Sequence, residues 1–589
     1  MADHTTDVDK HFVVLRSLPN HTRSPETLAL AKRWVADCSQ NHEKCRKTTV
    51  EGAWSPTRLL DLTRLTEVGR VNDGPEQLLD QTVFLIETAN APPVKRYTTL
   101  SHRWGSEEQV KLTKDTYLQL SNGVKLDSLP QLIQDAIFVT VELSVGYLWI
   151  DLLCIYQDDV ADWQRESSLM QKVYSNCFCN ISAGNANGCF ESMFNSRDPS
   201  MFLPQVIELE TRYQHVGEDD IILNRTKTLY RVFEASFWRN NVTNELVNKR
   251  AWVFQERFLS PRVLQFGKRL VTWDCLERPA ADMFPDGFPE ILRHLNRYRY
   301  FGGDFKSWRS IDEYGIDSPY ILWEHLVRRY SACALTFPGD KLVAFSGVAK
   351  HMAGILKDEY VAGMWRRYLE GELLWMVDAG KRKRQILGRQ PKPRPVEYRA
   401  PSWSWASVDG PVTPGRAPIN VESLLIKVED VHLSYQTGDT TGQVTGGWLR
   451  LRGILKELKL VGKILDNGWH VWHMYLDGVK VAILPDDFTA GGALTLDNFE
   501  GDFDEEYGNA LLFAMCARKT QRSDGLVNRQ MFILLFRLVN REKAVFERIG
   551  VFETFDEEVE TEVLKTQRPA DAPPIPCLEF RDGMHTICV

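Results

Sequence analysis

The stretch YLWIDLLCIYQDDVADWQRESSLMQKVYSNCFCNISA, residues 147–183, decides the fold class. An apolar run opens it, a helical pattern follows from about Asp162, and a second apolar run closes it. One face of the predicted helix carries side chains spaced three or four residues apart: Trp163, Glu166, Met170, Val173 and Cys177. Short apolar segments that alternate with amphipathic ones are typical of βαβ units on a mainly parallel sheet. We therefore predict an α/β region over residues 91–285.

Other patterns flank this region. Residues 1–90 form a preface with a helix that is predicted to begin after Ser24. Residues 286–410 are richer in helical pattern and form a predicted helical extension. Residues 411–565 consist of short β-rich runs separated by Gly and Asp, which predicts an antiparallel sandwich or barrel. Residues 566–589 begin with a proline-rich segment and are predicted to be a flexible tail.

The composition argues against several classes of protein. With 43% hydrophobic and 25% charged residues, the 589-residue chain has the composition of an ordinary globular protein. Its formal net charge of −8 argues against non-specific nucleic-acid binding, so nucleic acid is not an expected partner. No apolar run reaches the roughly 18 residues that cross a bilayer, so we expect no membrane span. Eleven cysteines at irregular intervals fit reduced thiols, and we expect a cytoplasmic protein.

A basic segment leaves a nuclear location open. Residues 381–395, KRKRQILGRQPKPRP, carry seven basic side chains between prolines. Such a segment is typical of a nuclear-import signal or a phosphate-binding patch, and equally of an exposed, solvated loop. All three interpretations stand at this point.

Three soft ligands repeat at helical spacing in the preface. Cys38, His42 and Cys45 lie at positions i, i+4 and i+7, so on a helix all three point the same way. They would bind Zn²⁺ if a fourth ligand came from elsewhere in the fold, and the sequence shows no such ligand. The alternative is a helix that packs with two buried thiols and a hydrogen-bonded imidazole.

Common catalytic and nucleotide-binding motifs are absent from the sequence, namely GxGxxG, GxxxxGK[ST], HExxH and GxSxG. Their absence argues against the standard dinucleotide-binding, nucleotide-binding, metalloprotease and serine-hydrolase sites. Any chemistry must use less standard groups.

Three longer blocks carry a family resemblance. YTTLSHRWG (97–105), the stretch 148–183, and KRAWVFQERFLSPRVLQF (249–266) together resemble the three blocks of the fungal heterokaryon-incompatibility (HET) domain. Small departures are His102 and Arg103, where the family often has Tyr and Cys. The resemblance implies a fungal protein of non-self recognition and programmed cell death signalling. It also implies that the protein acts through a protein partner or self-assembly.

The resemblance further implies a fold distantly similar to TIR domains. Some TIR domains cleave NAD⁺ with a glutamate on a helix that follows a strand, and by analogy Glu166 is the candidate catalytic residue. Ligands of open α/β sheets bind at the carboxyl ends of strands, which makes candidate binding residues of Ser101, Trp104, Asp158 and Asp159. A fixed carboxylate there would stabilise an oxocarbenium-like transition state. The alternative is that Glu166 is the ion-paired end of a core helix.

Other polar residues of the blocks are predicted to support the fold. Asp151 is expected in mid-strand, buried and hydrogen-bonded, with Ser101, Arg250 or Arg257 as candidate partners. In the third block the supporting residues are Arg250, Gln255, Glu256 and Arg257. The alternative is that Glu256 and Arg257 complete the ligand cleft.

Two functions of different classes therefore compete. The first is an interaction module that assembles or is activated by a partner. The second is an NAD glycohydrolase, with NAD as substrate rather than as a bound cofactor. Whether the chain is an enzyme depends on which of these holds.

Overall fold

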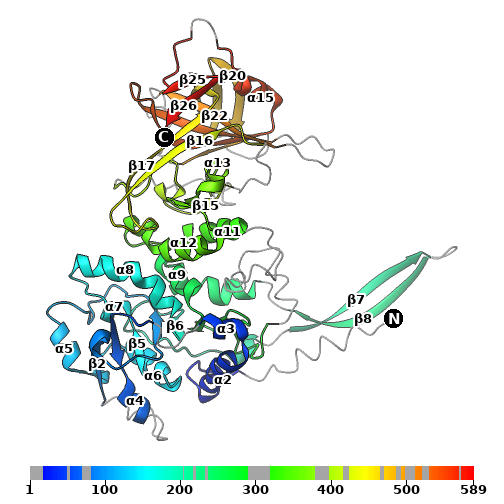
Figure 1. Ribbon diagram of the computed structural model, residues 1–589. Helices are drawn as coiled ribbons and strands as arrows, with labels where there is room; N and C mark the ends of the chain where they lie inside the picture. Colours follow the sequence, from blue (N-terminus) through cyan, green and yellow to red (C-terminus); the bar gives the residue numbers. More distant parts are fainter. Residues whose placement is uncertain are drawn as a thin grey trace. The chain divides into compact units, whose positions relative to one another are not determined.

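The computed structural model divides the chain into two compact units, Met1–Tyr314 and Gly315–Val589 (Figure 1). The residues that it describes are 18–48, 54–68, 81–202, 205–216, 221–232, 236–288, 319–378, 395, 397–415, 423–464, 470–485, 492–497, 511–520, 530–568 and 572–589. Most of the basic segment, residues 381–394, lies outside them. Within the described part, no helix has the length and apolar character needed to cross a membrane.

A nine-stranded sheet forms the centre of the first unit, in the order β11-β10-β9-β6-β3-β5-β1-β2-β4. The strands are β1 (Arg58–Asp61), β2 (Thr82–Glu87), β3 (Thr98–Ser101), β4 (Val124–Lys125), β5 (Tyr147–Trp149), β6 (Cys179–Ala183), β9 (Arg262–Phe266), β10 (Val271–Cys275) and β11 (Ala280–Ala281). The central pairs β5·β3, β3·β6 and β6·β9 are parallel, and the outer pairs are antiparallel. The predicted α/β class with a mainly parallel core is confirmed.

Helices connect these strands: α2 (Pro25–Asn41), α3 (Glu43–Thr48), α4 (Thr63–Val68), α5 (Tyr117–Asn122), α6 (Gln131–Glu142), α7 (Asp151–Cys154), α8 (Val160–Ser175) and α9 (Ala251–Leu259). Helix α2 begins as predicted, because the Ser24 side chain accepts a hydrogen bond from the Thr27 amide and caps it. Helix α8 begins in the same way, capped by Asp159. Its buried face includes Met170 and Val173, and the Val173 carbonyl accepts a hydrogen bond from Tyr97, the residue before β3.

The structure corrects the expected position of Asp151. Strand β5 ends at Trp149, and Asp151 is the first residue of α7 rather than the middle of a strand. The Leu152 amide donates to the Asp151 carboxylate at 2.8 Å, a local bond that starts the helical turn. Leu152, Leu153 and Cys154 are all buried, so the apolar run continues as a buried turn of helix.

A long hairpin interrupts the first unit after the third parallel strand. Strands β7 (Gln205–Val216) and β8 (Ile221–Val232) pair antiparallel along their whole lengths, and Figure 1 shows them as one extended ribbon. This hairpin differs from the alternating strands and helices expected for residues 91–285.

The second unit begins with helices and ends in an antiparallel sheet, as predicted. Its helices are α11 (Pro319–Ser331), α12 (Val343–Leu356), α13 (Leu369–Glu372) and α15 (Glu557–Leu564), and short strand pairs join β12 (Tyr360–Val361) to β13 (Met364–Trp365) and β14 (Met376–Val377) to β15 (Val412–Thr413). The large sheet has eleven strands: β16 (Lys427–Tyr435), β17 (Val444–Gly453), β18 (Leu455–Ile464), β19 (His470–Leu476), β20 (Val479–Pro485), β21 (Gly492–Leu496), β22 (Leu512–Thr520), β23 (Gln530–Asn540), β24 (Val545–Thr554), β25 (Glu579–Arg581) and β26 (Met584–Cys588). Met531, Ile533 and Leu535 alternate along β23 and are buried, as one face of a strand requires.

The predicted flexible tail is wrong in its last part. Strand β26 pairs with β17 over four residue pairs, from Arg450 opposite Cys588 to Gly453 opposite His585. Ile587 is fully buried within this sheet. Backbone pairing and burial of an apolar side chain fix the chain end, although its proline-rich approach resembles a linker.

Candidate functional site

Four ligand-type side chains meet at one edge of the first unit's sheet. Cys38 is on α2, His42 follows that helix, Cys45 is on α3, and Cys275 ends β10. All four are buried, and their ligand atoms lie within 4.8 Å of one another. We call these four residues the thiol–imidazole cluster. Its donor set suits a metal ion such as zinc.

The sequence predicted three members of this cluster and missed the fourth. Cys275 lies on the strand after the third sequence block, far from the local repeat of Cys38, His42 and Cys45. The turn between α2 and α3 brings the three residues to β10, where Cys275 completes the set. Its only sequence signal is its position at the end of an apolar run, VTWDC.

Donor groups from outside the four residues point at sulfur atoms of the cluster. Arg262 Nε donates to Cys38 Sγ at 3.2 Å, and the Arg278 amide donates to Cys275 Sγ at 3.4 Å. Hydrogen bonds from Cys275 and Cys38 lower the pKa of Cys45 to about 3. The hydrogen bonds with Cys275 and Cys45, together with burial, raise the pKa of Cys38, so the first proton to leave is that of Cys45.

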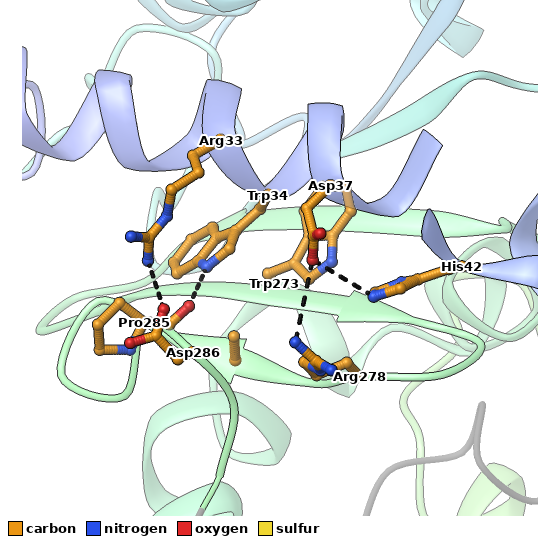
Figure 2. A pocket seen from close by; sticks show the side chains of 9 residues that line it. Arg33, Trp34, Asp37, His42, Trp273, Arg278, Pro285 and Asp286 are labelled. Atoms are coloured by element: carbon orange, nitrogen blue, oxygen red, sulfur yellow. Dashed lines mark hydrogen bonds and ion pairs between the residues drawn. The ribbon is translucent and has the colours of Figure 1, made fainter. Parts of the chain in front are cut away.

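A pocket of about 230 Å³ adjoins the cluster (Figure 2). Its lining includes the indoles of Trp34 and Trp273, which stack with centroids 6.4 Å apart. Asp37 borders it and lies 3.5 Å from His42 Nε2, on the side of the ring away from Cys275. The imidazole thus separates the buried thiols from this pocket.

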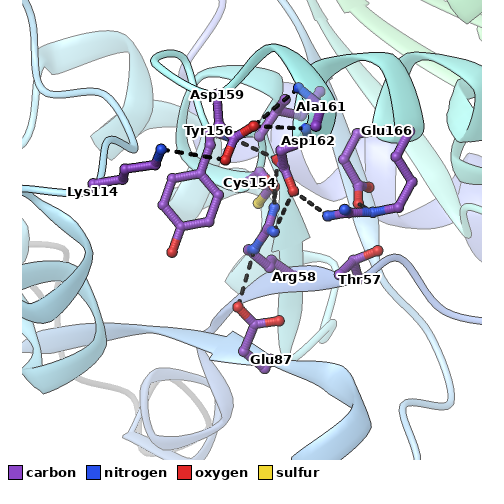
Figure 3. Close-up of polar contacts among 12 residues, drawn as sticks. Thr57, Arg58, Glu87, Lys114, Cys154, Tyr156, Asp159, Ala161, Asp162 and Glu166 are labelled. Atoms are coloured by element: carbon purple, nitrogen blue, oxygen red, sulfur yellow. Dashed lines mark hydrogen bonds and ion pairs between the residues drawn. The ribbon is translucent and has the colours of Figure 1, made fainter.

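Glu166 belongs to a second buried group, centred on Arg58 (Figure 3). Arg58, the first residue of β1, makes a bidentate pair with Asp162 of α8 at 2.7 and 3.1 Å. Arg58 also donates to Glu87 at 3.1 Å and to the Cys154 carbonyl at 2.9 Å. We call Arg58, Asp162 and Glu166 the arginine–carboxylate cluster.

The charges of this cluster are matched within the chain. Burial disfavours the charged forms of Arg58 and Asp162. The ion pair with Arg58 nevertheless holds the pKa of Asp162 below its usual value. Burial raises the pKa of Glu166, partly offset by a hydrogen bond with Thr57 and by Arg58. The Glu166 side chain is only 2% exposed and accepts from Arg165 Nε at 3.3 Å. Its described contacts are those of an ion-paired core residue.

Ser101 and Glu256 form a third buried group with Asn180 and Tyr174. Ser101 Oγ donates to the Glu256 carboxylate and receives a hydrogen bond from Asn180 Nδ2 at 2.9 Å. Burial, followed by the charge of Asp151, raises the pKa of Glu256 to about 7, while Ser101 and Tyr174 oppose that shift. We call these four residues the hydroxyl–carboxylate cluster. Its carboxyl group holds a proton at pH values where an exposed glutamate is ionised.

Asp151 lies beside this group, at the ends of strands β3 and β5. Trp104 Nε1 donates to Asp151 Oδ2 at 3.0 Å, and His102 Nδ1 lies 3.7 Å from Oδ1. Arg250 donates to the His102 carbonyl and joins the start of α9 to this corner. The described hydrogen bonds of the Asp151 carboxylate thus involve Trp104 and Leu152, in place of the expected Ser101, Arg250 or Arg257. Its side chain is 20% exposed, so Asp151 is half-buried rather than buried as expected.

The other predicted residues have local structural contacts. Asp158 accepts from the Lys114 amide at 3.0 Å, and Asp159 caps α8. Gln255 is buried, and Arg257 pairs with Asp274 at 3.2 Å. The described contacts place the predicted ligand residues in two different groups. Ser101 and Trp104 contact Glu256 and Asp151, respectively. Glu166 interacts instead with Arg58.

Comparison with known proteins assigns the central part of the first unit. Residues 97–256 match the family described as "Heterokaryon incompatibility protein (HET)". The match begins in the first block and ends at Glu256, within the third. No curated protein and no solved structure matches the chain. All four residues of the thiol–imidazole cluster lie outside the matched range.

Proposed function

Because the chain carries a heterokaryon-incompatibility domain over residues 97–256, we propose that it acts in fungal non-self recognition and programmed cell death. In this proposal it works in the cytoplasm, through regulated pairing with a second copy of itself. The observation that supports an interaction function is the hairpin β7–β8, which interrupts the domain.

The hairpin has the features of a sheet edge to which a further strand can pair. Over the described residues, β7 and β8 form a two-stranded sheet of their own. Leu209 is 45% exposed and Leu229 is 70% exposed, on the two faces of the ribbon. A two-stranded ribbon is only marginally stable in water, and its unpaired edges are templates for added strands. Pairing with the hairpin of a second copy would stabilise the ribbon and would occupy its unpaired edges.

NAD hydrolysis through Glu166 is the second function, and it rests on the analogy with TIR domains alone. A catalytic carboxylate must touch its substrate, whereas Glu166 is 2% exposed and accepts from Arg165. Fold similarity does not transfer activity. The contacts therefore favour the interaction function.

The test replaces exposed apolar side chains of the hairpin by charge. The double variant Leu209→Lys, Leu229→Lys should remain folded, become monomeric by light scattering, and lose cell killing. Leu118→Lys is the matched control, because Leu118 is 67% exposed on α5 and far from the hairpin in sequence. Killing by a monomeric, folded double variant would contradict the proposal. Release of nicotinamide from NAD⁺ by the wild-type protein, lost in Glu166→Gln, would support the hydrolase instead.

A further inference from the structure

We propose that Cys38, His42, Cys45 and Cys275 bind a structural zinc ion that fastens the N-terminal helices to the edge of the sheet. Three thiolates and one imidazole are a common zinc ligand set. All four donors come from the chain, so the site is closed and has no open position for a substrate. The role is therefore structural.

The separations of the donor atoms fit one tetrahedral ion. With Zn–S of about 2.3 Å and Zn–N of about 2.0–2.1 Å, neighbouring donors of a tetrahedron are about 3.6–3.8 Å apart. Cys275 Sγ and His42 Nδ1 are 3.4 Å apart, and no two donors are more than 4.8 Å apart. Binding requires movements of about 1 Å or less, which side-chain rotation supplies.

The surroundings of His42 define which ring nitrogen binds. Nδ1 faces Cys275, while Nε2 lies 3.5 Å from Asp37 Oδ2. A ligating histidine typically donates its other N–H to a carboxylate, which fixes the tautomer and strengthens the ligand. Asp37 is thus the positioning residue, and Nδ1 is the ligand atom.

With zinc present, the charges of the site also sum to zero. Three thiolates and Zn²⁺ carry a net charge of −1, and the Arg262 guanidinium next to Cys38 brings the total to zero. Arg262 is itself buried, so its charge requires a counter-charge nearby. The zinc–thiolate group supplies it.

The ion would join parts of the chain that are far apart in sequence. Cys45 belongs to α3 and Cys275 to β10, and other contacts also join the preface to this edge. They include the hydrogen bond from Trp34 Nε1 to the Pro285 carbonyl and the exposed pair of Arg33 with Asp286. A four-ligand ion is stronger than such contacts.

The experiment measures metal in the full chain, purified under reducing conditions without chelator. We expect about one zinc ion per chain, and cobalt(II) in its place should give the absorption bands of a tetrahedral thiolate site. Cys275→Ser should lose the zinc. Cys177→Ser is the matched control, because Cys177 is equally buried in the same unit and donates to the Tyr174 carbonyl, which serine can also do.

A second variant keeps the proposal testable if Cys275→Ser fails to fold. Asp37 is partly exposed, so Asp37→Asn should fold normally and weaken zinc binding by about 10–100-fold in competition with a chromophoric chelator. Wild-type protein without zinc and without the cobalt bands would overturn the proposal. So would a disulfide among Cys38, Cys45 and Cys275 in peptide mapping without reductant.

Discussion

The thiol–imidazole cluster and the arginine–carboxylate cluster are both buried in the first unit, yet they differ in how their charges are matched. Arg58 meets Asp162 bidentately and lies near Glu166, so the chain supplies the cation itself. The ligand atoms of the three thiols and His42 lie within 4.8 Å of one another, and this donor set suits a divalent ion. A buried acid is thus a weak indicator of a ligand site when an arginine already pairs with it. A convergent set of soft donors is a stronger indicator.

The largest expected effect is that of removing the metal. Stripping zinc with a strong chelator should destabilise the first unit by more than about 5 kcal/mol, because zinc binding is worth roughly 10–16 kcal/mol in small zinc domains. Circular dichroism during heating should show the loss of one transition, while the second unit, which holds none of the four ligands, unfolds as before. If the chelator left the melting of both units unchanged, the thiol–imidazole cluster would need a ligand no more than the arginine–carboxylate cluster does.

Breaking the arginine–carboxylate cluster should have the next largest effect. Arg58→Met leaves Asp162 buried without its partner and should cost about 3–5 kcal/mol in urea unfolding. Adding Asp162→Asn should restore part of the loss, since the uncompensated charge is then gone. Zinc content should not change in either variant. A loss below about 1 kcal/mol would show that the cluster does not depend on Arg58.

The hydroxyl–carboxylate cluster gives a pH-dependent effect of intermediate size. The pKa of Glu256 is about 7 in the folded protein and 4.5 for an ordinary glutamate, so the folded state binds a proton that the unfolded state releases. Stability should be highest below about pH 4.5 for this group and fall by roughly 3 kcal/mol as pH rises to about 7. Glu256→Gln should remove this fall. Parallel curves of unfolding free energy against pH for variant and wild type would contradict it.

Replacing Glu166 should have the smallest effect. Burial already raises its pKa, and Arg58 keeps its two bonds to Asp162, so Glu166→Gln should cost about 1 kcal/mol or less. Cell killing should persist in the folded variant, measured beside Arg58→Met. Loss of killing with normal stability would return Glu166 to a catalytic role.

Sequence periodicity predicted local features well. The helix of Met170 and Val173 follows from spacing along one segment, and so does the grouping of Cys38, His42 and Cys45, although the single helix expected to carry these three is wrong, because α2 ends at Asn41 and Cys45 lies on α3. Cys275 does not, because its place depends on the order of strands across the whole sheet.

Two errors arose where composition was ambiguous. The run around Asp151 is apolar enough for a strand or a buried helical turn, and a single carboxylate bond to the Leu152 amide favours the helix. The chain end follows a proline-rich segment, but the run of Met584–Cys588 finds a long-range partner in β17. Pairing over such a distance leaves no local signal.

The central claim is that the thiol–imidazole cluster holds zinc while the arginine–carboxylate cluster needs no ligand. X-ray absorption at the zinc edge of the purified wild-type chain tests it most directly. We predict a shell of sulfur at about 2.3 Å, contributed by three cysteines, and one nitrogen at about 2.0–2.1 Å. A chain without zinc, or zinc surrounded only by oxygen and nitrogen, would contradict the claim.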